Sequence, residues 1–147
     1  MFKKLLPPFL YAICIVAILI LGGASEGVFP YGVALVMGLP LAAGGLLLVK
    51  RTQRLFAQAG SQIHTFKTPR NFVSYDVFSY SRNPNYLGFL TSLLGIAFVV
   101  NGWGGLLPVA AFWAACHFVY IPFEEANAKR EFGEEYELYQ TRVRRWL

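Results

Sequence analysis

At 147 residues the chain has the length of one domain, and its composition excludes an ordinary soluble protein. Hydrophobic residues make up 56% and charged residues only 14%, whereas an average soluble domain has roughly 25% charged residues. The net charge of +5 does not indicate nucleic-acid binding, because the Lys and Arg residues lie in three clusters that flank apolar segments. We therefore expect one all-α integral membrane domain over residues 1–147, in contact with the lipid bilayer.

Two apolar segments in residues 1–49 predict the first two membrane-spanning helices. The first, from about Leu5 to Gly23, approaches the ~20 residues that cross a bilayer core, and the alternative is a cleaved signal peptide. The second segment runs from about Val28 to Val49. Within it, Pro40 and the pair Gly44-Gly45 predict a kink or a close contact with another helix.

Two further apolar segments follow a polar loop that spans residues 50–85. The third segment runs from Tyr86 to Val100, a turn is predicted at residues 101–105, and the fourth segment runs from about Leu106 to Phe123. His117 lies deep in the fourth segment, where an ionisable residue is either functional or a packed, hydrogen-bonded imidazole. Both cysteines lie in apolar stretches, and no Cys/His spacing resembles a metal site.

The charged tail from Glu124 to Leu147 has the pattern of an amphipathic helix. Its aromatic and apolar residues recur at helical steps and predict one apolar face, formed by Phe132, Tyr136, Tyr139, Val143 and Trp146. Gly133 can separate this helix from an extension of the fourth segment. A helix of this kind can lie on the membrane surface.

The positions of the basic residues predict the topology. With four spans, the N-terminus, the 50–85 loop and the tail share one side of the membrane, and together they hold all 13 Lys and Arg residues. The opposite side holds Glu26 and no basic residue. The positive-inside rule therefore places both termini in the cytoplasm of a multi-pass protein.

The third and fourth segments form a predicted antiparallel hairpin that brings two polar stretches together. Arg82, Asn83 and Tyr86 precede or begin the third segment, and Glu124 and Glu125 follow the fourth. Two adjacent carboxylates at a membrane boundary are costly to desolvate unless they are paired. Either Arg82 or a cationic ligand pairs with them, or the carboxylates face water.

The same stretches carry a family resemblance. Residues 81–88, Ser-Arg-Asn-Pro-Asn-Tyr-Leu-Gly, are followed by Glu124-Glu125 and by residues 132–136, Phe-Gly-Glu-Glu-Tyr. This pairing resembles the isoprenylcysteine carboxyl methyltransferase family and, more loosely, the related phospholipid N-methyltransferases. The resemblance covers residues 59–146. It implies that residues 50–147 form a cofactor-binding loop, a helical hairpin and a C-terminal tail.

The resemblance implies a membrane methyltransferase that uses S-adenosylmethionine at the cytosolic face. It implies catalytic roles for Arg82, Asn83 and Glu124, and it places Tyr120 where relatives have a substrate-binding residue. It also implies cofactor contacts from a set of loop, helix and tail residues: Arg70, Asn71, Phe72, Val73, Phe78, Asn83, Pro84, Asn85, Tyr86, Glu124 and Tyr136. Because Asn83 is typical of bacterial-type relatives, the resemblance also indicates a bacterial inner membrane.

Several functions agree with these motifs. A membrane methyltransferase would act on a lipophilic small molecule, a lipid or a prenylcysteine-like carboxylate. The stretch Asn-Pro-Asn-Tyr-Leu-Gly also resembles a motif of NADPH-dependent membrane reductases of the sterol or steroid type. A third possibility is a non-catalytic membrane protein with a degenerate site, because Ser74–Val77 replaces the turn usual in the family. A soluble methyltransferase is excluded, since no Gly-x-Gly-x-x-Gly follows a strand-like run.

Overall fold

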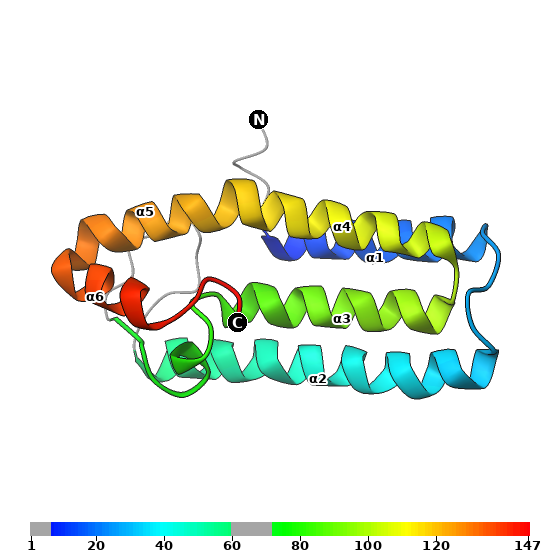
Figure 1. Ribbon diagram of the computed structural model, residues 1–147, viewed down its shortest axis with the longest axis horizontal. Helices are drawn as coiled ribbons and strands as arrows, with labels where there is room; N and C mark the ends of the chain where they lie inside the picture. Colours follow the sequence, from blue (N-terminus) through cyan, green and yellow to red (C-terminus); the bar gives the residue numbers. More distant parts are fainter. Residues whose placement is uncertain (1–6, 60–71) are drawn as a thin grey trace.

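The computed structural model describes residues 7–59 and 72–147, and in this part of the chain every regular element is a helix. Long helical rods run side by side, with a smaller helix folded back at one end (Figure 1). The long helices are α1 (Pro7–Gly23), α2 (Tyr31–Gln58), α3 (Pro84–Val100) and the rod formed by α4 (Leu106–Ala115), η4 (Cys116–Tyr120) and α5 (Ile121–Phe132). The shorter elements are η2 (Asp76–Ser79), η3 (Trp103–Gly105) and α6 (Glu134–Arg142).

Helix α3 is the centre of the bundle, and none of its residues is fully exposed. It contacts α1, α2 and α4. Its contact with α2 is close because Gly45 faces it: a Cβ on Gly45 would lie 2.4 Å from the backbone N of Ser92. The predicted close helix contact is thus confirmed at Gly45, while Gly44 has no neighbouring atom within 4 Å of an added Cβ. Helix α2 continues through Pro40 without ending.

The outer faces of the bundle are apolar, as in a membrane protein. Helices α1 and α2 expose many large hydrophobic side chains, among them Phe9, Val36 and Leu47. Among the described residues, Tyr31–Gln58 and Trp103–Phe132 are long and apolar enough to cross a bilayer, and α1 and α3 are shorter apolar helices of 17 residues.

The fourth rod extends beyond its apolar segment, as the position of Gly133 predicts. It continues past Phe123 to Phe132, and a π-helical turn over Cys116–Tyr120, which the sequence did not predict, interrupts it. The π turn lies just before Pro122, whose nitrogen has no hydrogen to donate to the preceding turn. The extension carries Glu124 and Glu125 on a rigid helix beyond the apolar segment.

The tail forms a shorter helix than its periodicity predicts. Gly133 separates α5 from α6, as predicted, with φ +54°, a conformation that glycine adopts most easily. The predicted single helical face through Trp146 is wrong, because α6 ends at Arg142 and Val143 is extended. The five residues from Val143 to Leu147, here named the C-terminal strap, run back towards the membrane helices, where Trp146 packs against the main hydrophobic core.

The predicted turn at residues 101–105 is confirmed, and one side chain fastens it. Asn101 adopts φ +62°, its Oδ1 accepts hydrogen bonds from the backbone nitrogens of Val28 (3.2 Å) and Phe29 (3.0 Å), and its Nδ2 donates to the Phe29 oxygen (2.7 Å). The α1–α2 connection is therefore tied to the α3–α4 turn at the end of the bundle opposite α6 (Figure 1).

Candidate functional site

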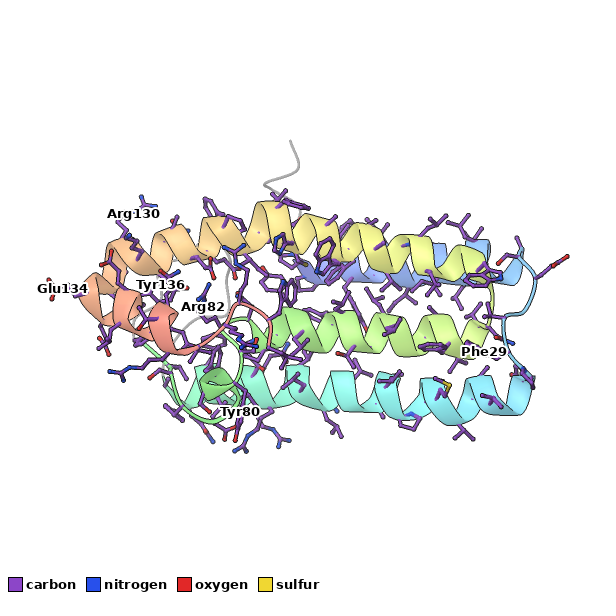
Figure 2. All side chains as sticks on the ribbon, in the orientation of Figure 1. Phe29, Tyr80, Arg82, Arg130, Glu134 and Tyr136 are labelled. Atoms are coloured by element: carbon purple, nitrogen blue, oxygen red, sulfur yellow. The ribbon has the colours of Figure 1, made fainter. Side chains whose placement is uncertain are left out.

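A cavity of about 200 Å³ lies at the α6 end of the bundle. Its walls come from the ends of α1, α2, α3 and α5, from η2 and from α6. Figure 2 labels two of its lining residues, Arg82 and Tyr136, between α5, α6 and the loop before α3. The full lining consists of Pro7, Pro8, Gln53, Phe56, Phe72, Val73, Phe78, Arg82, Asn83, Pro84, Asn85, Tyr86, Phe89, Glu124, Glu125, Asn127, Ala128, Phe132, Tyr136 and Tyr139.

The loop from Ser81 to Asn83 leads into α3, and local contacts fix its conformation. Pro84 occupies the first helical position, where its missing N–H costs no hydrogen bond, and it restricts Asn83 to a non-helical conformation with φ −130°. The buried Ser81 hydroxyl accepts a hydrogen bond from the Asn83 backbone nitrogen at 3.1 Å. The motif residues are therefore presented by a short, internally bonded loop.

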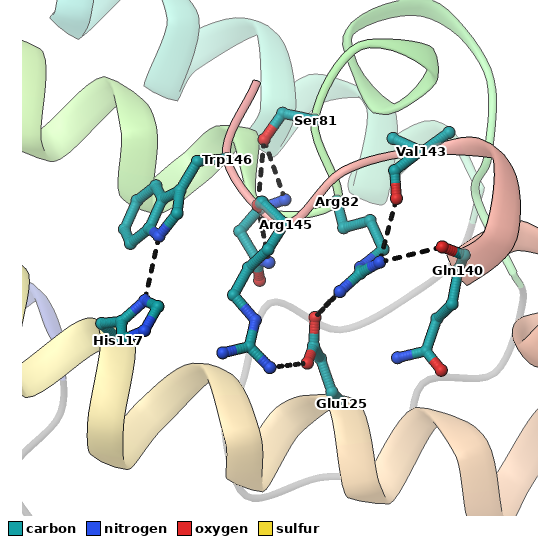
Figure 3. A network of polar contacts seen from close by, with 9 residues as sticks. Ser81, Arg82, His117, Glu125, Gln140, Val143, Arg145 and Trp146 are labelled. Carbon is teal, nitrogen blue, oxygen red and sulfur yellow. Dashed lines mark hydrogen bonds and ion pairs between the residues drawn. The ribbon is translucent and has the colours of Figure 1, made fainter.

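Glu125 is the centre of a buried charge network. Its Oε1 accepts hydrogen bonds from Nε and Nη2 of Arg82 at 3.0 and 2.8 Å, and its Oε2 accepts one from Nη2 of Arg145 at 2.6 Å (Figure 3). The side chains of Arg82 and Glu125 are only 11% and 9% exposed. Of the alternatives that the sequence left open for the two carboxylates, pairing with Arg82 holds for Glu125.

Arg82 also ends helix α6. Its Nη1 donates to the carbonyl oxygens of Gln140 (3.2 Å) and Val143 (2.9 Å). The last carbonyls of a helix have no partner within the helix, so a guanidinium placed there satisfies them and complements the helix dipole. One arginine thus joins the loop before α3, the carboxylate on α5 and the end of α6.

Glu124 faces the other side of the cavity and pairs with Tyr86. The Tyr86 hydroxyl donates to Oε1 of Glu124 at 2.8 Å. Tyr86 also stacks on Tyr120, with ring centroids 6.4 Å apart and planes 15° from parallel. Tyr120 is only 5% exposed and lies behind Tyr86, outside the cavity lining.

An aromatic wall closes the cavity on the α6 side. The ring of Phe72 contacts those of Phe132, Tyr136 and Tyr139, with centroid distances between 5.2 and 5.9 Å. The Tyr139 hydroxyl donates to the carbonyl oxygen of Phe78 at 2.6 Å, which holds α6 against η2. Burial raises the pKa of Tyr139 and raises that of Tyr136 to about 12, so both phenols stay neutral donors at physiological pH.

One polar atom in the wall of the cavity is unsatisfied. Oδ1 of Asn85 is buried and has no hydrogen-bond partner among the described residues. Buried polar atoms in proteins nearly always have partners, so an unpaired acceptor in a cavity wall suits a ligand that brings a donor. Together, the cavity offers this acceptor, the Glu124 carboxylate for a cation and aromatic rings for a flat group.

Most of the residues that the sequence predicts for the site line this cavity. The structure brings the predicted residues Phe72, Val73, Phe78, Arg82, Asn83, Pro84, Asn85, Tyr86, Glu124 and Tyr136 to one cavity. Arg70 and Asn71 lie outside the described residues. The sequence did not assign Phe89 to the site, whereas Phe132 and Tyr139, which also line the cavity, lie on the predicted apolar face of the tail. Among the described residues, no group of His, Cys, Asp and Glu could hold a metal ion.

Comparison with known proteins gives one match. The model of a family described as phospholipid methyltransferase matches residues 33–135, which include Arg82, Asn85, Tyr86, Glu124 and Glu125. No curated protein and no solved structure matches the chain.

Proposed function

Because the chain belongs to the phospholipid methyltransferase family, we propose that it transfers a methyl group from S-adenosylmethionine to a lipophilic acceptor at the membrane surface. The predicted family relationship is confirmed by the match over residues 33–135, and the family is one of membrane methyltransferases. The cofactor, the acceptor and the residue roles are our proposal. The family match does not favour the NADPH-dependent reductase.

The observation that carries the proposal is the convergence of Glu124, Asn85 and the aromatic wall on one cavity. S-adenosylmethionine combines a sulfonium cation, an adenine ring, hydroxyl groups and an amino acid moiety. The Glu124 carboxylate, oriented by Tyr86, suits the cationic part, and Oδ1 of Asn85 suits a hydroxyl or amino donor. Phe72 and Phe132 offer ring faces to the adenine. The residues present therefore fit the cofactor.

When bound, S-adenosylmethionine supplies an activated methyl group on its sulfonium. The chain's own task is then to orient the two reactants and exclude water, because methyl transfer depends on alignment and proximity. Arg82 holds the cavity wall in place through Glu125 and α6. Glu124 can accept a proton from an amine or hydroxyl acceptor, whereas a carboxylate acceptor needs no base.

We propose that the acceptor enters from the bilayer. Pro7 and Pro8 of α1, Phe56 of α2 and Phe89 of α3 give the cavity an apolar side towards the membrane helices. A lipid or prenylcysteine-like molecule can keep its chain in the bilayer and place its polar end beside Glu124. Tyr120 stays a predicted substrate-binding residue. Because it is stacked behind Tyr86, it would affect the substrate by setting the position of the Tyr86 ring.

We also propose four membrane spans, with both termini and the cavity at the cytoplasmic face of a bacterial inner membrane. The concentration of Lys and Arg residues at the cavity end supports this orientation. Helices α1 and α3 have 17 residues each, and at 1.5 Å per residue such helices reach about 26 Å, close to the bilayer core.

The test is a comparison of ligands on purified protein in detergent micelles. We expect S-adenosylmethionine to raise the unfolding temperature in a saturable way and NADPH to leave it unchanged. Glu124→Gln is expected to weaken S-adenosylmethionine affinity about tenfold or more, because it removes a charged partner. Glu131→Gln is the matched control, since Glu131 is an exposed carboxylate on the same helix. Stabilisation by NADPH alone, or equal affinities in the two variants, would overturn the proposal.

A further inference from the structure

The C-terminal strap, residues 143–147, lies beside the loop from Ser81 to Asn83, here named the motif loop (Figure 3). It has no helical structure of its own. None of its residues belongs to the cavity lining. Its contacts therefore act on the cavity from behind, through the residues that line it.

Three successive carbonyl groups of the strap hold the motif. The oxygen of Val143 accepts from the Arg82 side chain at 2.9 Å, and the oxygen of Arg144 accepts from the Arg82 backbone nitrogen at 3.0 Å. The oxygen of Arg145 accepts from Nδ2 of Asn83 at 3.1 Å. The Arg145 side chain also binds Glu125. The orientation of three lining residues is thus set by a stretch that follows the last helix.

Besides the contact of Arg145 with Glu125, a second side-chain hydrogen bond ties the strap to the fourth rod, nearer its middle. Nε1 of Trp146 donates to Nδ1 of His117 at 3.2 Å (Figure 3). The imidazole ring also contacts two indole rings, with centroid distances of 6.4 Å to Trp146 and 5.1 Å to Trp113 and planes within 15° of parallel. His117 is carried by the π turn, halfway along the fourth rod. The bond requires an imidazole that is unprotonated at Nδ1.

We propose that His117 and Trp146 are positioning residues: their hydrogen bond holds the strap in place, and the strap holds Arg82 and Asn83 in the geometry that binds the cofactor. The inference rests on the proposed function, because it concerns the same cavity. It gives His117 a role at a distance from the ligand, in contrast to a direct contact. It also explains why a polar pair lies at this depth in an apolar helix bundle.

The first measurement needs no ligand. Hydrogen–deuterium exchange of peptides that contain Arg82 reports whether its amide stays bonded to the Arg144 carbonyl. Trp146→Phe keeps a ring that packs but removes the N–H, and His117→Leu keeps the bulk but removes the acceptor. We expect each to speed exchange in this peptide about 3- to 10-fold, as for the loss of one hydrogen bond. His117→Asn restores an acceptor near the Nδ1 position and is expected to restore slow exchange.

The second measurement is the affinity of the purified full chain for S-adenosylmethionine in micelles. Trp146→Phe and His117→Leu are each expected to weaken binding about 3- to 10-fold, and the double variant no further, because both remove the same bond. His117→Asn is expected to bind as the unmodified chain does. Trp103→Phe is the control, since Trp103 is an exposed indole in η3 at the opposite end of the bundle.

The two measurements separate the inference from the proposed function. Unchanged exchange around Arg82 in Trp146→Phe and His117→Leu would overturn the positioning role, and so would equal effects in Trp103→Phe. If the unmodified chain bound no S-adenosylmethionine, the proposed function would fail, while the exchange measurement would still decide whether the bond holds the motif loop.

Discussion

Glu125 is the residue whose alteration tests the site most sharply. Glu125→Gln keeps the shape of the side chain but removes its charge, and it leaves only one acceptor oxygen. In the structure the two carboxylate oxygens serve different arginines, Arg82 at 2.8 Å and Arg145 at 2.6 Å. An amide can serve only one of them, and its NH2 group would face the other as a second donor.

The burial of Arg82 and Arg145 determines how much unfolding free energy the Glu125→Gln variant should lose. Arg145 is 32% exposed and can turn its charge towards water, whereas Arg82 is 11% exposed and cannot. Removing one partner of a buried ion pair costs about 3–5 kcal/mol, because the remaining charge is left uncompensated. Because only Arg82 is left with a buried, uncompensated charge, we expect Glu125→Gln to lower the free energy of unfolding by about 3 kcal/mol, the lower end of this range.

The assay is the free energy of unfolding of purified protein in mixed micelles, measured by denaturant titration for Glu125→Gln and for Glu137→Gln. Glu137 forms an ion pair with Lys129 in which both side chains are more than half exposed. Such surface pairs contribute about 0–1 kcal/mol, so Glu137→Gln is the matched control. If Glu125→Gln destabilised the protein no more than Glu137→Gln, the buried network would not hold the site together.

Three further predictions concern the surroundings of the site. Gly45→Ala should cost about 1–3 kcal/mol of unfolding free energy through overpacking, because its Cβ meets α3 backbone atoms, whereas Gly44→Ala should be tolerated; equal effects would refute the close α2–α3 contact. Tyr139→Phe should cost about 1–3 kcal/mol and weaken cofactor binding, since it leaves the buried Phe78 carbonyl unpaired; normal binding with normal stability would show that the contact of α6 with η2 is dispensable. The hydrogen bond from Arg51 on α2 lowers the pKa of Asp76 in the folded protein. The ionised Asp76 therefore stabilises the fold fully above its ordinary pKa of about 3.9, and this contribution is lost as the pH falls through the lower pKa of the folded state. Asp76→Asn should reduce that acid sensitivity, and an unchanged pH profile would argue against the ion pair.

Much of the fold could be predicted because membrane helices are encoded by long apolar runs. All four predicted apolar segments coincide with helices, of which the second and fourth extend beyond the apolar part, and the turn at residues 101–105 follows from Asn101 and its neighbouring glycines. The predicted antiparallel hairpin of the third and fourth segments also placed the loop before α3 next to the part of the fourth rod that carries Glu124 and Glu125. These features depend on local composition and on simple connectivity.

The features that the sequence did not predict depend on contacts between distant residues. Val143 and Trp146 fit the helical period of the tail, yet α6 ends at Arg142 because Arg82, far earlier in the chain, binds its last carbonyls. The π turn at Cys116–Tyr120 was not predicted either, although Pro122 follows it closely in the sequence. The sequence also could not decide which of two adjacent carboxylates binds Arg82.

The structure shows which of the two adjacent carboxylates binds Arg82, and helix geometry explains why they have different partners. Successive residues of an α-helix point about 100° apart, so Glu124 and Glu125 cannot face the same partner. The structure directs Glu125 to Arg82 and Glu124 to Tyr86 across the cavity. One carboxylate thereby binds the arginines that build the site, and the other lines the cavity beside Tyr86.

The most direct test of the central claim is transfer of a labelled methyl group. Purified protein in micelles would be incubated with S-adenosylmethionine tritiated on its methyl group and with a total lipid extract of bacterial inner membranes, and the organic phase would be counted. We expect label in a lipid fraction that depends on the protein, falls at least tenfold in Glu124→Gln and is retained in Glu131→Gln. Saturable cofactor binding without any label in the organic phase would contradict a lipophilic acceptor, and label that persists in Glu124→Gln would contradict the assigned site.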